Sequence, residues 1–541
     1  MRRVLLPVIG GMLGARPATA AAQARIDDAT SVRVAVNDET ERYLRALEVR
    51  GLTKLEPWSI RAFSPIQLQR LVATDSAHPW RGRLAPSPLT APGPGVRWEL
   101  LAPETRLVFN SRFPYGFNDG AVWAGRGLTT AVQGGIGLRY GVLTAVVEPI
   151  VFRAENGDFP LAANGRSGRL VFADPRYAGT IDLPQRFGDG AYQRFDPGQS
   201  TIRIDYRGAA LGISTANQHW GPAIAHPLLL GNNAAGYAHL FVGTSRPVGV
   251  GIGSVHGRLV WGRLEQSAYG VLEGRQSRRF SAGAVGVFQP RGAPGLEIGA
   301  ARFFHILWPE GGPELGDFLL PLSGLTEVAR ARETGGSGIE PDNQLASVFL
   351  RWAFPASGFE MYAEYARDDR NYDARDLIVE PDHDAGYLLG FQKVWRNSPT
   401  TLTALRAELL DTRITHLQLS RAEAPFYVHG SALQGHTQRG QVLGSAGAFG
   451  GGAALVAFDR WTPRGRWTVS WTRLMRGERF GTSNLPQPLE ADVAHALGVE
   501  ALWLRRGLDL TAGLTGVHEY NRDFAGDASN VNLTFGARAH W

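Results

Sequence analysis

The chain is patterned mainly by apolar and polar residues that alternate with a period of two. Such alternation predicts strands with one apolar and one polar face. The last eleven residues are the clearest case: Val531, Leu533, Phe535, Ala537, Ala539 and Trp541 are apolar, and the polar residues Asn532, Thr534, Arg538 and His540 lie between them. The pattern recurs at 201–206, 347–354, 359–364 and 466–472. An amphipathic strand of a soluble β-protein and the closing strand of a barrel both fit the terminal stretch.

The connections between these strands favour the barrel. Short turns are predicted at 134–135, 207–208, 355–358, 397–399 and 506–507, and long connections at 154–199, 217–237, 263–279, 305–343, 368–385 and 412–448. Short turns at one end and long loops at the other are typical of outer-membrane barrels, whose closure leaves no unpaired edge in lipid. We therefore predict an all-β fold over residues 96–541. It is a transmembrane antiparallel β-barrel of about 18 strands, within a rough range of 16–20.

Charged residues follow the polar phase of these strands. They are Arg203, Arg351, Arg406, Arg466, Arg538, Asp205, Glu360, Glu364, Glu408 and Glu500. An ionised side chain that faces lipid near the midplane costs about 2–4 kcal/mol. We therefore expect these groups to face the lumen, where they either only brace the barrel or also help to conduct a solute.

The first 95 residues follow a different pattern. A basic start, an apolar segment at 4–15 and small residues at 18–24 predict a signal peptide over residues 1–24. Residues 25–95 predict a periplasmic helical module and linker that plugs or braces the barrel. One helix is expected at 39–50, with Asp38 and Glu41 at capping-box spacing and Gly51 as its stop, and another after Ser64-Pro65.

Composition narrows the possible functions. The chain has no cysteine, which excludes disulfides, thiol chemistry and cysteine–metal sites. Its formal charge of +6 falls to +3 if cleavage after Ala24 removes Arg2, Arg3 and Arg16. A nearly balanced charge argues against a nucleic-acid partner. No later apolar run is long enough for a transmembrane helix. We expect outer-membrane lipid as a partner, and no cofactor and no metal.

Two of the long connections contain distinctive motifs. The first has Trp220-Gly221-Pro222, an apolar run at 228–230 and the pair Asn232-Asn233. The second has Tyr427-Val428-His429-Gly430 followed by a stretch with Arg439 that ends in Leu443-Gly444. These motifs, together with a signal peptide, a helical module and a large barrel, resemble the capsule assembly Wzi family.

The resemblance implies a non-catalytic outer-membrane barrel that binds capsular or other surface polysaccharide and helps organise the capsule, with capsule-export machinery as a further partner. Sugar binding needs aromatic faces and fixed polar groups. Our candidate binding residues are Gln218, Trp220, Asn232, Asn233, Tyr427, His429, Gln438 and Arg439, with Trp308, Tyr372 and Gln434 as further candidates. The alternative is that these loops fold inward and plug the barrel.

Other functions remain open on the sequence. A diffusion porin would need an open lumen. A hydrolase could use the spacing of His429 and Ser431, although no third group that orients the histidine is evident. The acidic stretch 380–384, with His383, could position a water or bind a metal, but it also fits a solvated loop tip.

Overall fold

The computed structural model describes residues 34–71, 77–81, 83, 87, 89, 95–326, 342–369, 373–414, 424–476 and 491–539. The predicted signal peptide, Tyr372, His540 and Trp541 lie outside these residues. No helix in the described part of the chain is both long and apolar enough to cross a membrane.

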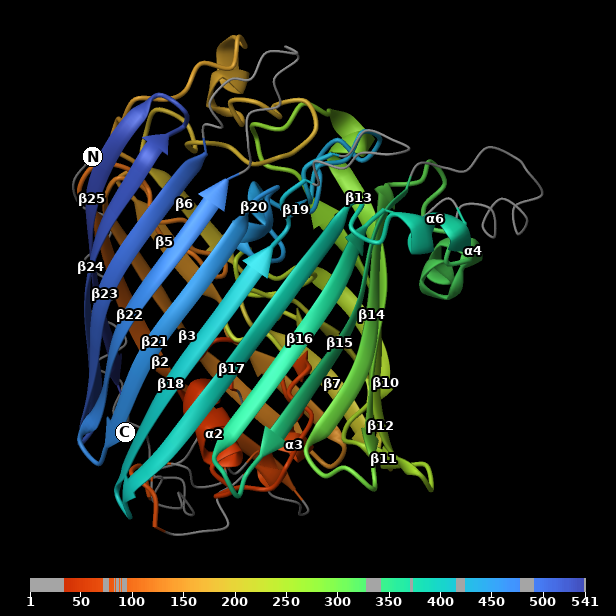
Figure 1. Cartoon of the computed structure of the whole chain (residues 1–541), viewed down its shortest axis with the longest axis vertical. Coiled ribbons are helices and arrows are strands. Elements are labelled where there is room, and N and C mark those ends of the chain that lie inside the picture. Colours follow the sequence, from red (N-terminus) through yellow and green to blue (C-terminus); the bar gives the residue numbers. More distant parts are fainter. Residues whose placement is uncertain are drawn as a thin grey trace.

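The chain forms a closed antiparallel barrel whose long strands are tilted relative to the barrel axis (Figure 1). Its strands are β2 (Val96–Asn110), β3 (Gly127–Tyr140), β4 (Leu143–Val147), β5 (Ile150–Ala154), β6 (Tyr192–Asp196), β7 (Thr201–Tyr206), β8 (Ala209–Ser214), β10 (Ala238–Thr244), β11 (Val248–Gly249), β12 (Gly253–Glu265), β13 (Arg278–Pro290), β14 (Leu296–Leu307), β15 (Asp342–Phe354), β16 (Phe359–Asp368), β17 (Ala385–Ser398), β18 (Thr401–Asp411), β21 (Gly452–Thr462), β22 (Gly465–Arg476), β23 (Asp492–Arg505), β24 (Leu508–Arg522) and β25 (Gly526–Ala539). Three strands are interrupted, because β4 with β5, β6 with β7, and β10 with β11 continue one another along the same neighbour; with each pair counted once, the barrel has 18 strands.

The predicted closing strand is confirmed as far as Ala539. Strand β25 pairs with β2 in a register that sets Phe535 opposite Leu107. Val531, Leu533 and Phe535 are exposed on the outer wall, whereas Asn530 and Asn532 are buried on the inner one. Closure therefore satisfies the backbone groups that an edge strand would leave unpaired in lipid.

The charges predicted to face the lumen do so. Arg203 pairs with Asp205, Arg351 with Glu360, and Arg406 with Asp459. Arg466 pairs with Glu500, and Arg538 lies 3.8 Å from Asp38 of the N-terminal module. The inner wall is thus held by ion pairs between strands and between the wall and the module.

Two predicted connections are wrong in part. Gly134-Gly135 is not a turn but lies inside β3, which runs unbroken past both β4 and β5. A side chain at Gly135 would place its Cβ 1.9 Å from the carbonyl oxygen of Val147, so this glycine allows close backbone approach. The predicted connection 154–199 contains β6, a strand of five residues that is too short for its alternation to stand out.

The predicted helices are confirmed at the lower end of the barrel in Figure 1. They are α2 (Glu39–Val49) and α3 (Pro65–Arg70), and β1 (Ile60–Arg61) lies between them. The Asp38 side chain accepts the N–H of Thr40, and Glu41 accepts that of Asn37, one residue earlier than a capping box requires. Ser64 and Gln67 form a full capping box at α3.

The remaining elements are short and lie in connections between strands. They are η1 (Gly168–Phe172), β9 (His219–Trp220), η2 (Gly274–Ser277), α4 (Leu315–Phe318), η3 (Leu320–Leu322), α6 (Ala374–Val379), β19 (Thr437–Gln438), β20 (Gln441–Val442) and η4 (Ala446–Ala448). The long connections lie at the end opposite the helices, which in outer-membrane barrels faces the outside.

Candidate functional site

Two long connections fold into the barrel instead of standing above it. We call their described parts, 215–237 and 424–451, the loop plug. Its apolar side chains, among them Trp220, Leu229 and Tyr427, form one hydrophobic core with inner-wall residues such as Phe303 and Leu388. The upper lumen is therefore packed with protein along much of the inner wall.

The helical module forms a second core at the other end of the lumen. Tyr43, Leu47 and Trp58 pack there against the wall residues Val394 and Trp461. Polar contacts tie the module to strands around the whole barrel; they join Ser87 to Glu99, Arg139 to the Leu89 carbonyl, Gln67 to His256, Arg83 to Asp509 and Asp38 to Arg538.

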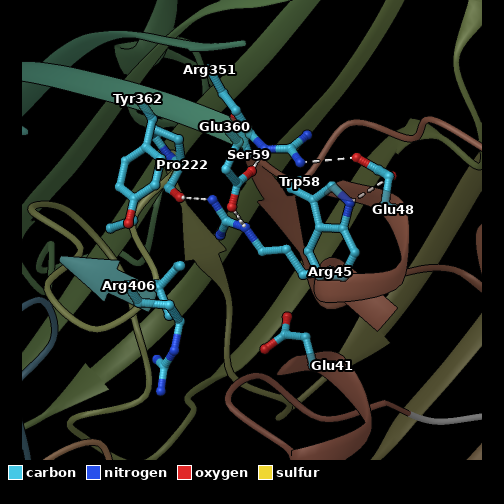
Figure 2. A network of polar contacts seen from close by, with 12 residues as sticks. Glu41, Arg45, Glu48, Trp58, Ser59, Pro222, Arg351, Glu360, Tyr362 and Arg406 are labelled. Carbon is cyan, nitrogen blue, oxygen red and sulfur yellow. Dashed lines mark hydrogen bonds and ion pairs between the residues drawn. The ribbon is translucent and has the colours of Figure 1, made fainter. Parts of the chain in front are cut away.

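An ionic cluster lies between the two cores (Figure 2). The guanidinium of Arg351 donates to Glu360 and Glu297 at 2.6 Å each and to Glu48 of α2 at 2.9 Å. All four side chains are at most 1% exposed. Burial raises the pKa of Glu48 to about 7, although its contacts with Arg351 and two N–H donors oppose that rise. One arginine thus joins the barrel wall to the helical module.

The loop plug reaches down to the module and pairs with it. Strand β9 is antiparallel to β1, with Trp220 opposite Ile60 and His219 opposite Arg61. Arg61 donates to the Ala223 carbonyl at 2.6 Å, and Arg45 of α2 donates to the Pro222 carbonyl at 2.9 Å (Figure 2). An outward connection and the N-terminal module therefore share one small sheet inside the lumen.

Two of the aromatic candidates from the sequence lie within this packing. Trp220 and Tyr427 are both 0% exposed. The Trp220 ring meets Phe303 edge to face at 5.9 Å, and the Tyr427 hydroxyl donates to the Leu228 carbonyl. Trp308 instead packs against Phe280 on the outer side of the wall. In this state these rings hold the connections in place.

The polar candidates are hydrogen-bonded to other parts of the chain. Gln218 accepts from Arg258, and Gln438 accepts the Glu265 N–H; both glutamines are buried. The Nε and Nη2 groups of Arg439 both donate to the same carboxylate oxygen of Glu265, and its Nη1 group donates to Asp196 at 3.0 Å.

The amide candidates join neighbouring connections in the same way. Asn232 donates to the Asn118 carbonyl, Asn233 to that of Val442, and Gln434 to that of Gln276. Asn232 and Asn233 are half-buried. Like Gln218, Gln438 and Arg439, these amides brace the loop plug.

The residues weighed for hydrolysis do not form a nucleophile–base pair through their side chains. Nδ1 of His429 accepts the backbone N–H groups of Ser431 and Ala432. The His383 side chain is buried, and its Nε2 atom lies 3.1 Å from a carboxylate oxygen of Asp384. The stretch 380–384 is therefore not simply a solvated loop tip. Within the described residues, no group of three or more histidine, aspartate or glutamate side chains is arranged to hold a metal ion.

A small, open cleft lies at the outward end of the barrel. Its walls come from the connection 155–191, from the loop plug, and from the ends of β22 and β24. The lining residues are Asp174, Pro175, Arg176, Tyr177, Pro425, Phe449, Gly450, Arg476, Asp523 and Phe524. The cleft therefore combines three aromatic rings with two arginines and two aspartates.

Both arginines of the cleft are held by contacts with neighbouring residues. The Arg176 guanidinium lies 3.1 Å from the centre of the Phe524 ring, and Phe524 has a φ of 61°, which is rare for an aromatic residue. Arg476 pairs with Asp523 at 2.7 Å. Burial opposes ionisation of Asp523, but Arg476, Arg522 and Arg176 together outweigh burial and lower the pKa of this carboxyl.

The buried aspartate at the base of the cleft orders its loop. Asp174 accepts the N–H groups of Arg176 and Tyr177. Burial raises the pKa of the Asp174 carboxyl, and those two hydrogen bonds oppose the rise. Asp174 thereby positions Arg176 and Tyr177 at the cleft.

Sequence reasoning missed this cleft, because its residues come from four separate parts of the chain. Asp174-Pro175-Arg176-Tyr177 carried a local signal, since a turn dipeptide, a cation and an aromatic ring follow one another in a long connection. Phe524 carried none, because it lies in a hairpin turn with no unusual composition.

Comparisons with known proteins agree with this architecture. The family model for capsule assembly protein Wzi matches residues 176–459, which include the loop plug and part of the cleft. The structure is similar to Wzi of Escherichia coli, an outer-membrane, carbohydrate-binding β-barrel involved in group 1 capsule assembly. The TM-score is 0.61 at 14% identity, and the match covers 93% of this chain and 98% of that one.

More distant similarity extends to other barrels. OpdQ of Pseudomonas aeruginosa matches with a TM-score of 0.39 at 8% identity, over 82% of this chain and 98% of that one. OccAB2 of Acinetobacter baumannii matches with a TM-score of 0.40 at 10% identity, over 81% and 97%. No curated protein matches the chain. The family match spans more than half of the sequence, and the chain belongs to the capsule assembly protein Wzi family.

Proposed function

We propose that this barrel binds capsular or other surface polysaccharide at its outward end, without cleaving it, and so helps to attach or organise a capsule. The observation that carries the proposal is the cleft around Arg176, Tyr177 and Phe524, at the mouth of a barrel whose lumen is packed. Aromatic rings suit the apolar faces of sugars, and arginine and aspartate suit their hydroxyl and carboxylate groups. Carbohydrate binding by the Escherichia coli relative supports the same proposal.

The residues first considered for binding enter the proposal in two groups. Asn232, Asn233, His429 and Arg439 are half-buried, so they can extend the sugar-binding surface beyond the cleft. Gln218, Trp220, Tyr427 and Gln438 are buried and contribute by holding the loop plug in shape.

The setting of this function is part of the proposal. Residues 1–24 act as a signal peptide, 25–95 as a periplasmic module with its linker, and 96–541 as the outer-membrane barrel. The outward apolar wall meets lipid, and capsule-export machinery is a further partner.

The test uses the purified barrel and polysaccharide from its own organism. We expect retention of the polymer at unchanged length, as measured by a binding titration followed by size-exclusion chromatography. Phe524→Ala should weaken binding about fivefold, because stacking on one ring is worth about 1 kcal/mol. Arg176→Ala should weaken it in a salt-dependent way if the polymer is acidic.

The controls separate binding from folding and from catalysis. Arg506→Ala, at an exposed turn on the opposite end, should leave binding unchanged. Ser431→Ala should also leave both binding and polymer length unchanged. Equal binding by the cleft variants and Arg506→Ala would refute the site, and polymer shortening that depends on Ser431 would refute the non-catalytic function.

A further inference from the structure

Two stretches of the chain lie on the outside of the barrel wall, not over its mouth. They are residues 308–326, which contain α4 and η3, and residues 373–384, which contain α6; we call them the outer segments. Figure 1 shows α4 and α6 beyond the barrel outline, near the upper ends of β14 to β16. Both segments belong to the long connections that flank β15 and β16.

The first outer segment covers a patch of the outer wall. Phe304 and Ile306 of β14 share the outward face with the exposed Ile298, yet both are buried. With Phe280 and Ala282 of β13 they form a core that includes Leu320 of η3. The indole N–H of Trp261 also donates to the Phe318 carbonyl at 2.9 Å. The segment is thus packed onto the side of the barrel that otherwise meets lipid.

Two outward-facing arginines fasten the segments. Arg302 donates to the carbonyls of Pro321, Ser323 and Gly324 in the first segment. Arg367 donates to those of Glu380 and Pro381 in the second. These arginines are exceptions to the inward placement of charge, and backbone carbonyls of the outer segments compensate both.

The two arginines lie in the same register of the sheet. Ala346 of β15 is opposite Arg302 on one side and Arg367 on the other. Since neighbouring strands are about 4.8 Å apart, the two side chains start about 10 Å from each other. The outer segments are therefore neighbours on the wall.

Ala346 lies near the outer edge of the apolar band. Aromatic rings of Trp352, Phe354 and Phe359 cluster at the lower turn and mark the other edge. Ala346 lies eight residues above Phe354, or about 20 Å along the membrane normal for a strand tilted by about 40°, in a band about 25 Å tall. The Tyr365–Tyr387 ring pair sits just below it.

The faces that the outer segments turn away from the wall are apolar. Leu315, Leu322 and Leu325 are exposed by 76%, 72% and 70%, and Ile378 by 79%. Leu319, Leu377 and Val379 are also exposed. The nearby charges are mostly acidic, with Glu310, Glu314, Asp373 and Asp376 against Arg375, so lipid phosphate is not the group they attract.

We infer that the outer segments form a membrane-contact surface whose leucine, isoleucine and valine side chains insert among acyl chains at the outer edge of the lipid layer. The surface continues the lipid-facing wall, where Val348 and Leu389 are exposed two and four residues nearer the lower turn in the strand register. Short apolar elements at such an interface bury their side chains about 5–10 Å into the boundary between headgroups and chains. The outer segments thereby fix the depth of the barrel in the membrane.

The absence of cysteine from the sequence makes a direct test possible. Single-cysteine variants Leu322→Cys and Ile378→Cys of the full-length protein are labelled with bimane and placed in phosphatidylcholine vesicles with brominated acyl chains. Leu389→Cys on β17 gives the lipid reference, and Glu273→Cys, 82% exposed before η2, gives the water reference. We expect both probes to lose at least half as much fluorescence to brominated lipid as Leu389 does, and to resist aqueous iodide.

Two outcomes would overturn the inference. Quenching by iodide but not by brominated lipid would place these side chains in water. Protection from both quenchers would mean that protein, such as a second copy of the chain, covers the surface. If a label at Leu322 prevents assembly, Leu315→Cys on the same segment replaces it, and assembly is checked by heat-modifiable gel migration.

Discussion

At the scale of single residues, Arg351 is a buried cation shared by three carboxylates. It satisfies carboxylates from two barrel strands and from α2 in a region without exposure to water. Removing one partner of a buried ion pair costs about 3–5 kcal/mol, because the other charge remains unpaired. Here one substitution leaves Glu48, Glu297 and Glu360 without their shared cation.

We therefore expect Arg351→Ala to lower thermal stability strongly, as seen in a lower temperature for the gel shift from folded to unfolded barrel. Arg351→Lys should recover only part of the loss, because an ammonium group cannot reproduce the planar fork of a guanidinium. Arg506→Ala is the matched control at an exposed turn. Equal transition temperatures for Arg351→Ala and Arg506→Ala would contradict this role.

The alternation of residues was enough to predict which side chains face inward, because it depends only on backbone geometry. It could not predict that Trp220 and Tyr427 would be buried, because nothing in the composition of a loop tells whether a ring points to solvent or into the lumen. The sequence did hold one unused signal: Arg302 lies on the apolar phase of β14, between Ile298 and Ile306. A charge on that phase requires a partner on the outer wall.

At the scale of elements, the sequence predicts structures that depend on local signals but not those that depend on tertiary contacts. Helices α2 and α3 could be predicted because their caps are local, as the Ser64–Gln67 box illustrates. The pairing of β1 with β9 could not, since each strand has two residues and they lie about 160 positions apart. That pairing links the two ends of the lumen. A substitution in the module should therefore alter the stability of the outward connection.

We expect Arg61→Ala, made in the module, to speed amide hydrogen exchange at residues 219–224 of the loop plug. The substitution removes the donor to the Ala223 carbonyl and loosens the sheet in which the Gly221 N–H donates to the Ser59 carbonyl. Mass spectrometry of the corresponding peptide measures the effect. Arg70→Ala, in the same module but on its more exposed side, is the control and should leave this peptide unchanged. Unchanged exchange at 219–224 in both variants would show that the two ends are independent.

At the scale of the whole molecule, the lumen is obstructed twice. The loop plug packs against the upper inner wall, and the helical module contacts strands around the lower one. Neither core could be inferred from the strand pattern, which determines the size of a barrel but not what fills it. This difference matters for function, because a diffusion porin and a binding barrel share the same wall.

Because the lumen is obstructed at two places, we expect the current in planar bilayers to depend on how many of the two cores are removed. The unmodified protein should show little or no steady current. Replacing residues 217–235 and 427–444 with short glycine–serine linkers should open the upper core only, and removing residues 34–71 should open the lower core only, so each variant alone should remain nearly silent. The combined variant should conduct, provided that it still migrates as a folded barrel, because a barrel of 18 strands is wide enough for an aqueous channel once it is emptied. Large, stable channels in the unmodified protein would instead identify a porin, and a current in either single variant would show that one core alone keeps the lumen closed.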